Sequence, residues 1–235
     1  MNCIVVLCDT LRRDHCGPYH HGRPLDEIQS AEQPDWTVPT PNMDRLAERG
    51  TTFDPAYHGS TPCMPARRDI YTGRYEFLER GWGPLEENDR DLPREVSGDP
   101  NSAIAGLESD GMSVSQLITD HYHPWEQDSG NYHFGYTGFE FVRGHESDNW
   151  CIEPIEFDSP EEPESRLQRH WRNLASVSGD RPTTDGVPDD EPDHFGTRVF
   201  DEAADWIDRN HDREDFTSTS TVSTLTSRSG RRRIS

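Results

Sequence analysis

Residues 2–9 read NCIVVLCD, an apolar run that ends in the carboxylate of Asp9. A run of this kind, without polar alternation, is typical of a buried parallel strand. In open α/β sheets, ligands bind beyond the carboxyl ends of the strands. We therefore expect Asp9 to lie at that edge of a parallel sheet, where a carboxylate can bind Ca²⁺ or Mg²⁺.

The next segments predict alternating elements. Residues 40–50 read TPNMDRLAERG, with a threonine cap, a proline at the first helical position and a terminal glycine, which predicts a short amphipathic helix. Residues 51–57 predict a brief strand. Strand, helix and strand in this order favour an α/β fold.

A second helix is expected in residues 60–74, which read STPCMPARRDIYTGR. Pro65 suits its first turn and Gly73 its end, and Arg67 lies on the same helical face as Cys63. The helix N-terminus and the guanidinium both favour negative charge, so this site would lower the pKa of the Cys63 thiol or hold an oxyanion. A structural cysteine in an ordinary helix cap is the alternative.

These stretches together resemble the sulfatase family. Residues 63–67 match its signature Cys-x-Pro-x-Arg, which precedes a short helix ending in Thr-Gly-Arg, and residues 40–47 are similar to its Thr-Pro-Asn-x-Asp-Arg-Leu-Ala stretch. The resemblance implies a three-layer α/β/α sandwich with a mostly parallel sheet, of the alkaline phosphatase-like superfamily and truncated at its C-terminal side. It also implies a sulfuric ester hydrolase.

The resemblance further implies a chemistry for Cys63, Asp9 and Arg67. In sulfatases, a maturation enzyme oxidises the cysteine to formylglycine, whose hydrated form attacks the sulfur of a small-molecule sulfate ester beside a divalent cation, Ca²⁺ or Mg²⁺. Asp9 and Cys63 would be the metal ligands, and Arg67 would stabilise the nucleophile. Many members carry two adjacent aspartates, whereas Thr10 follows Asp9 here, so one ligand is either missing or replaced by a hydroxyl.

Two histidines stand near the place where the family has Gly-Lys-x-His. Residues 113–119 carry a Ser-x-x-Gln capping box, which predicts a helix that ends before His121 and His123. By resemblance, His121 takes the place of the lysine and would bind the sulfate, and His123 would protonate the leaving oxygen. The alternative is that both are surface histidines in a solvent-exposed loop, without a role in a site.

Two later segments complete the expected elements. Residues 131–144 are rich in aromatic residues and predict an edge strand. Residues 197–208 place apolar side chains along one helical face, which predicts a helix packed on the sheet.

The composition is strongly acidic. The chain of 235 residues has 45 acidic and 23 basic residues, none of them lysine, and a net charge of −22. This charge argues against nucleic acid or an anionic membrane as a partner, and the composition looks like that of an extreme halophile. No apolar stretch is long enough to span a bilayer and no signal-type segment precedes the first strand, so we expect a cytoplasmic location.

The end of the chain differs in composition, because residues 217–235 lack acidic residues and alternate serine with threonine. We expect residues 1–216 to be the N-terminal part of a sulfatase-like catalytic domain and residues 217–235 to be a disordered tail, either natural or produced by a frameshift that truncates the protein. Truncation would impair the activity. The alternative functions are a phosphonate monoester or phosphodiester hydrolase of the same superfamily and a non-catalytic remnant.

Overall fold

The computed structural model describes residues 2–13, 16–19, 40–75, 79–97, 113–126, 128–146, 148–150, 172–173, 194–213 and 216–223. The chain divides into two compact units, one of Met1–Asp9 with Gly59–Ser235 and one of Thr10–His58. The first unit carries the sheet and the candidate site.

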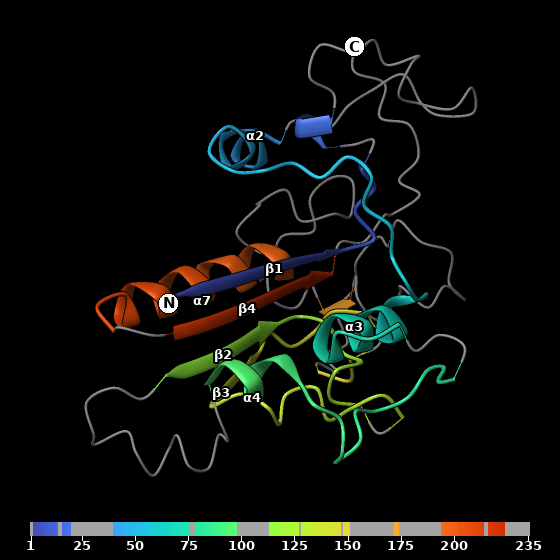
Figure 1. Ribbon diagram of the computed structural model, residues 1–235. Helices are drawn as coiled ribbons and strands as arrows, with labels where there is room; N and C mark the ends of the chain where they lie inside the picture. The colour runs from blue at the N-terminus through green and yellow to red at the C-terminus, as the bar shows by residue number, and fades with distance from the viewer. Residues whose placement is uncertain are drawn as a thin grey trace. The chain divides into compact units, whose positions relative to one another are not determined.

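The first unit is built around a parallel sheet (Figure 1). In the described part of the chain it has four strands, in the order β1 (Cys3–Asp9), β4 (Phe216–Ser223), β2 (Val114–Thr119) and β3 (Gly138–Phe141). Every pair of neighbours is parallel. Parallel strands bring their carboxyl ends to one edge, so the residues that follow β1, β2 and β3 come together there.

Helices cover both faces of this sheet. The helices are α3 (Cys63–Thr72), α4 (Leu92–Ser97) and α7 (Phe195–Asn210). Ile118 of β2 belongs to one buried cluster with Val199 of α7, and the adjacent Leu117 belongs to another with Met64 of α3. Successive side chains of a strand point to opposite faces, so α7 covers one face and α3 the other (Figure 1). The α/β sandwich and the helix predicted at 197–208 are confirmed.

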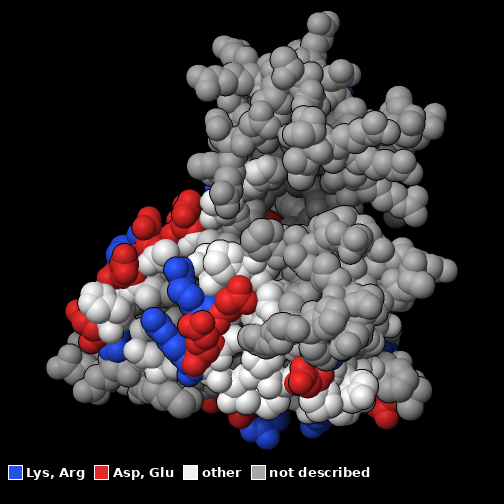
Figure 2. Space-filling model, turned by 90° about the horizontal axis from the view of Figure 1, so that it is seen from above, with Lys and Arg blue, Asp and Glu red and all other residues white. Residues whose placement is uncertain are grey.

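The outer surface of α7 carries charged side chains. Acidic and basic side chains also lie interspersed on the face of the molecule that Figure 2 shows. Val199 and Ala203 of this helix are buried against the sheet, whereas Asp201, Glu202 and Asp205 are exposed. The helix is thus amphipathic, with an apolar stripe against the sheet and polar residues on the opposite face.

The second unit contains η2 (Gly17–Tyr19) and α2 (Pro41–Ala47) among its described residues. The helix predicted at 40–50 is confirmed, but the Thr40 hydroxyl does not cap it and instead accepts a hydrogen bond from the Gly17 N–H at 2.7 Å. The strand predicted at 51–57 is wrong. Phe53 and Tyr57 are exposed, and this segment lacks the pairing and the buried face that a strand needs.

The helix predicted at residues 113–119 is also wrong, because Val114–Thr119 form β2 between β4 and β3. The side chains of this segment are buried on both faces, apart from Gln116. Pairing on two sides and burial on two faces outweigh the local capping signal. The prediction of an edge strand within 131–144 is confirmed by β3, which ends the described sheet.

The prediction of disorder from residue 217 onward is wrong for residues 217–223. They belong to β4, which pairs with β1 on one side and β2 on the other. Backbone hydrogen bonds to two neighbours hold a strand whose side chains are mostly small and polar. Residues 224–235 lie outside the described residues. The frameshift stays a prediction, which resequencing of the locus would check.

We expect Ser218→Ala to stabilise the protein. Ser218 is fully buried in β4, and its hydroxyl has no hydrogen-bond partner among the described residues. Burial of such a hydroxyl costs about 1–3 kcal/mol, so the free energy of unfolding in urea should rise by about 1 kcal/mol. The control is Ser129→Ala, because the buried Ser129 hydroxyl donates to the His123 carbonyl at 2.9 Å. That variant should lose stability, and a similar loss in Ser218→Ala would contradict the prediction.

Candidate active site

Three donor side chains from three elements meet at the carboxyl edge of the sheet. Asp9 ends β1, Cys63 begins α3, and His121 follows β2 by two residues. A carboxylate oxygen, the sulfur and a ring nitrogen of these residues all lie within 4.8 Å of one another. The structure thus brings Cys63 and Asp9 together, and it places beside them His121, which the resemblance assigns to sulfate binding.

Local signals fix where α3 begins and ends, and hence where its side chains point. Pro65 lies in the first turn, where a missing N–H costs nothing. Gly73 has φ of 69° and closes the helix with its N–H on the Asp69 carbonyl at 2.8 Å. These ends place Arg67 one turn after Cys63, on the side of Asp9.

Arg67 is a buried guanidinium that faces the three donors. It is 3% exposed, and its Nη1 donates to Oδ2 of Asp9 at 3.1 Å. Its Nε and Nη2 are also buried, with no hydrogen-bond partner among the described residues. Buried guanidinium donors are normally bonded. The two remaining donors therefore mark a place that suits the oxygens of an anion.

The predicted low pKa of the Cys63 thiol is wrong. Burial raises this pKa above its ordinary value, and it outweighs the opposing effect of Arg67. Asp9 and Glu146 raise the pKa further, because a thiolate beside carboxylates is repelled by them. The thiol is therefore not activated by its surroundings alone.

His121 is a neutral imidazole at neutral pH. It is 1% exposed, and burial, followed by the charge of Arg67, holds its pKa far below its usual range. Its Nδ1 lies 3.7 Å from Oε1 of Glu146. A neutral imidazole keeps one N–H donor and one lone pair, so His121 can donate to an anion or bind a metal.

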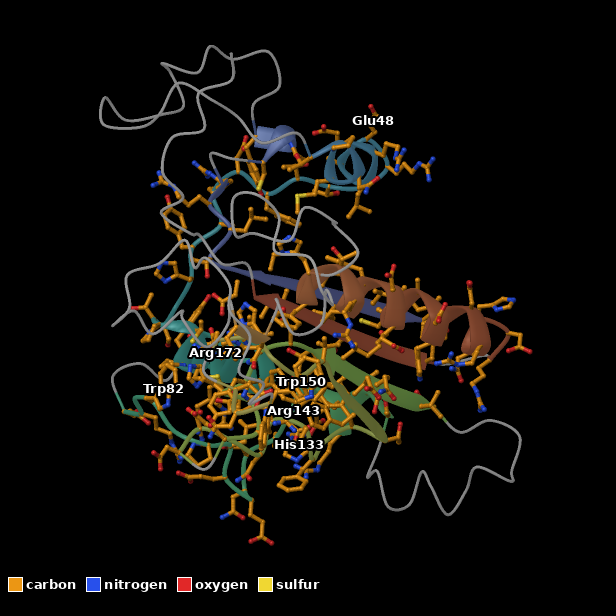
Figure 3. All side chains as sticks on the ribbon, turned by 180° about the vertical axis from the view of Figure 1, so that it is seen from behind. Glu48, Trp82, His133, Arg143, Trp150 and Arg172 are labelled. Carbon is orange, nitrogen blue, oxygen red and sulfur yellow. The ribbon has the colours of Figure 1, made fainter. Side chains whose placement is uncertain are left out.

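His123 lies next to His121 and is partly exposed. The two imidazole rings meet edge to face with their centroids 5.1 Å apart. The ring of Trp82, which is labelled in Figure 3, meets the His123 ring at 4.8 Å between centroids. Carboxylates flank both nitrogens: Nδ1 is 2.6 Å from Oε1 of Glu126, and Nε2 is 3.6 Å from Oε2 of Glu146. The side chain is 27% exposed, so this ring can reach both the site and water.

Glu146 is a residue of the site that the sequence analysis does not identify. It follows β3 in a loop, and its φ of 53° is a conformation that residues other than glycine rarely adopt. Arg143, which is labelled in Figure 3, donates to both oxygens of Asp148 at 2.7 and 2.8 Å, and this pair closes the loop. Burial raises the pKa of the Glu146 carboxyl. No motif in the sequence marks Glu146, and only the placement of β3 beside β2 brings it to His121.

Comparisons with known proteins find the following similarities. The family model described as Sulfatase matches residues 1–224. N-acetylgalactosamine-6-sulfatase of the dog, Canis lupus familiaris, is 24% identical over 179 residues, which are 72% of this chain and 29% of that protein. The crystal structure of the phosphonate monoester hydrolase of Agrobacterium radiobacter is similar with a TM-score of 0.44 and 19% identity, over 96% of this chain and 40% of that one. The chain thus spans less than half the length of either protein.

The described helices are all too short or too polar to cross a bilayer.

The family match over residues 1–224 includes β1 with Asp9 and the segment that contains Cys63 and Arg67. This chain belongs to the sulfatase family.

Proposed function

We propose that the protein hydrolyses sulfuric esters of small molecules, with a formylglycine made from Cys63 as its nucleophile. The observation that supports this most is the pair of buried Arg67 donors beside Asp9 and Cys63. They form an anion subsite within one helical turn of the residue that would carry the nucleophile. A sulfate ester has the charge and the oxygen atoms that such donors bind.

The proposal includes a divalent cation, Ca²⁺ or Mg²⁺, at Asp9 and residue 63. With the thiol intact, the described donors are one oxygen, one sulfur and one nitrogen, a poor set for cations that prefer six or more oxygens. Formylglycine replaces the sulfur by oxygen and therefore fits the hard cation better. The cation would supply positive charge that favours the ionised form of a bound hydroxyl.

The residues of this chain would divide the remaining work. Nε and Nη2 of Arg67 bind the oxygens of the sulfate, and the neutral His121 donates its N–H to the same group. His123 gives the proton of its Nε2 to the departing alcohol oxygen, while its Nδ1 stays against Glu126. Cys63 requires a separate maturation enzyme, which is the protein partner that the proposal implies.

The test uses the full chain, coexpressed with a formylglycine-generating enzyme. The mass of the peptide that contains residue 63 gives the converted fraction, and the substrates are an aryl sulfate and an aryl phosphonate monoester. We expect the aryl sulfate to be hydrolysed faster, and Cys63→Ala to hydrolyse neither. Faster phosphonate hydrolysis would support the alternative hydrolase, and a converted protein without either activity would support a remnant.

A further inference from the structure

We infer that the unconverted protein, with a thiol at residue 63, binds Zn²⁺ through Asp9, Cys63 and His121. This inference uses the same three side chains as the proposed function but concerns the form of the chain that precedes formylglycine. It requires neither sulfate ester hydrolysis nor the maturation enzyme.

The chemistry of the donors selects the cation. The three ligand atoms within 4.8 Å of one another are a carboxylate oxygen, a sulfur and an imidazole nitrogen. Zn²⁺ is bound in proteins by these three kinds of atom, whereas Ca²⁺ and Mg²⁺ prefer oxygen alone. Three protein ligands leave a fourth position open for water, which is the composition of catalytic zinc sites. The thiol form should therefore prefer Zn²⁺ to the hard cations of the proposed enzyme.

The surroundings of the three ligands suit a metal ion. His121 is almost completely buried, whereas Asp9 and Cys63 are partly exposed and leave an approach from solvent. Glu146 faces Nδ1 of His121 at 3.7 Å, and Arg67 donates to Oδ2 of Asp9 at 3.1 Å. Such neighbours orient metal ligands, and their loss typically weakens metal binding by 10- to 100-fold.

The binding step is a proton exchange without oxidation or reduction. The sulfur of Cys63 loses its proton to the buffer and forms a bond to the metal, and Asp9 supplies a second negative charge. The thiolate and the carboxylate together neutralise the dication.

Cobalt is the probe, because Co²⁺ occupies zinc sites and absorbs visibly when it is bound by a thiolate. The full chain is produced without a maturation enzyme, and mass spectrometry verifies the thiol at residue 63. We expect one equivalent of Co²⁺ to give a sulfur-to-cobalt charge-transfer band. Zn²⁺ should remove this band at equimolar concentration, whereas a large excess of Ca²⁺ or Mg²⁺ should leave it unchanged.

Variants assign the band to its ligands. Cys63→Ser should abolish it, and Asp9→Asn or His121→Gln should weaken Co²⁺ binding at least tenfold. The matched control is Cys8→Ser, which removes a thiol from the neighbouring position of β1. Its side chain points to the opposite side of the strand from Asp9, so the band should persist. Circular dichroism verifies that each variant is folded.

Three outcomes would overturn the inference: no charge-transfer band in the wild-type thiol form, a band that survives in Cys63→Ser, or equal competition by Ca²⁺. Each is distinct from a failure of the proposed function. The hydrolysis assay uses converted protein that lacks the thiol, so an inactive converted enzyme leaves the cobalt result intact. Likewise, a missing band in the thiol form leaves the hydrolysis assay untouched.

Discussion

Arg67→Ala is expected to lower kcat/KM for aryl sulfate hydrolysis by the converted protein by about 10²- to 10³-fold. The reason is the loss of two buried donors that have no partner among the described residues, together with the 3.1 Å contact that orients Asp9. Arg67→Lys should recover only part of the rate, because an ammonium group keeps the charge but lacks the planar arrangement of N–H donors of a guanidinium group. Steady-state kinetics on protein of known formylglycine content measures both variants.

The control for this prediction is Arg90→Ala. Arg90 is exposed and pairs with Glu95 at 2.7 Å, in a part of the first unit that does not contribute to the three-donor cluster. Its removal should leave kcat/KM unchanged. If folded Arg67→Ala hydrolysed aryl sulfate within fivefold of the wild type, Arg67 would not bind the sulfate, and the anion subsite of the proposed function would be lost.

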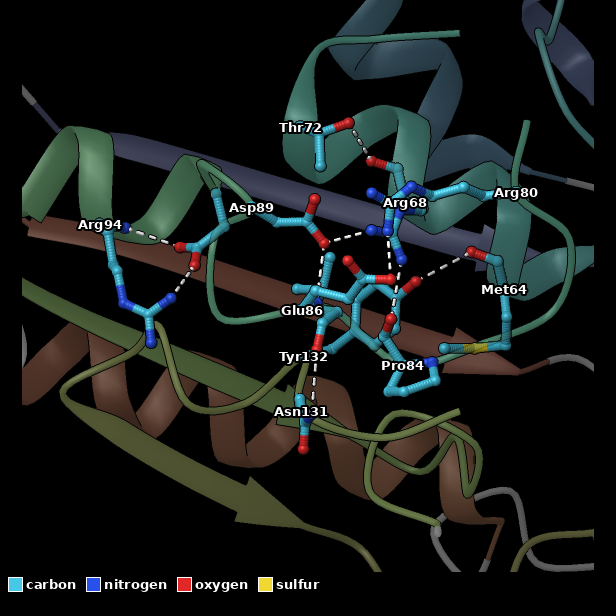
Figure 4. Close-up of polar contacts among 12 residues, drawn as sticks. Met64, Arg68, Thr72, Arg80, Pro84, Glu86, Asp89, Arg94, Asn131 and Tyr132 are labelled. Carbon is cyan, nitrogen blue, oxygen red and sulfur yellow. Dashed lines mark hydrogen bonds and ion pairs between the residues drawn. The ribbon is translucent and has the colours of Figure 1, made fainter. Parts of the chain in front are cut away.

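Asp89→Ala is expected to lower the free energy of unfolding by about 3–5 kcal/mol. Asp89 holds the buried Arg68 in an ion pair and also accepts the N–H of Glu86 at 2.8 Å (Figure 4). Arg68 is 3% exposed and donates to the Pro84 carbonyl at 2.7 Å. Without the carboxylate, the buried charge of Arg68 loses this ion pair. A loss of this size is a large fraction of a typical domain's stability, and urea unfolding measures it.

The matched comparison is Glu95→Ala, which breaks the exposed pair with Arg90. Exposed ion pairs contribute about 0–1 kcal/mol, so this variant should unfold almost like the wild type. Equal effects in the two variants would contradict the prediction, because burial of the arginine is what distinguishes Arg68 from Arg90. Since Arg68 follows Arg67 in α3, Asp89→Ala should also loosen the helix that presents the site.

The parts of the fold that follow from short-range patterns are those that the sequence predicts well. The strand at β1, the proline and glycine that bound α3, and the stripe of Val199 and Ala203 in α7 each depend on residues within one element. The four-residue spacing of Cys63 and Arg67 is similarly local. These patterns depend on backbone conformation and helical period, which neighbouring residues largely control. The expected burial of β1 is wrong, because β1 ends the described sheet and its Ile4 and Val6 are exposed.

The central strands depend on their neighbours instead. Residues 114–119 carry a helix-capping pattern and residues 217–223 a polar composition, yet both form strands because each pairs on two sides. The pKa of the Cys63 thiol is a similar case. The helix N-terminus and Arg67 predict a low value, and burial beside Asp9 and Glu146 raises it.

The sequence by itself determined the family, the strand that ends in Asp9 and the helix that begins at Cys63, because these features are encoded in residues a few positions apart. The resemblance already placed His121 in the site, but only the tertiary structure brought its ring nitrogen within 4.8 Å of the donor atoms of Asp9 and Cys63 and set Glu146 opposite His121. Parallel strands bring the ends of β1, β2 and β3 to one edge of the sheet, although β1 ends more than a hundred positions before β2 and β3 do. Such proximity depends on which strands pair, and local sequence does not specify that choice.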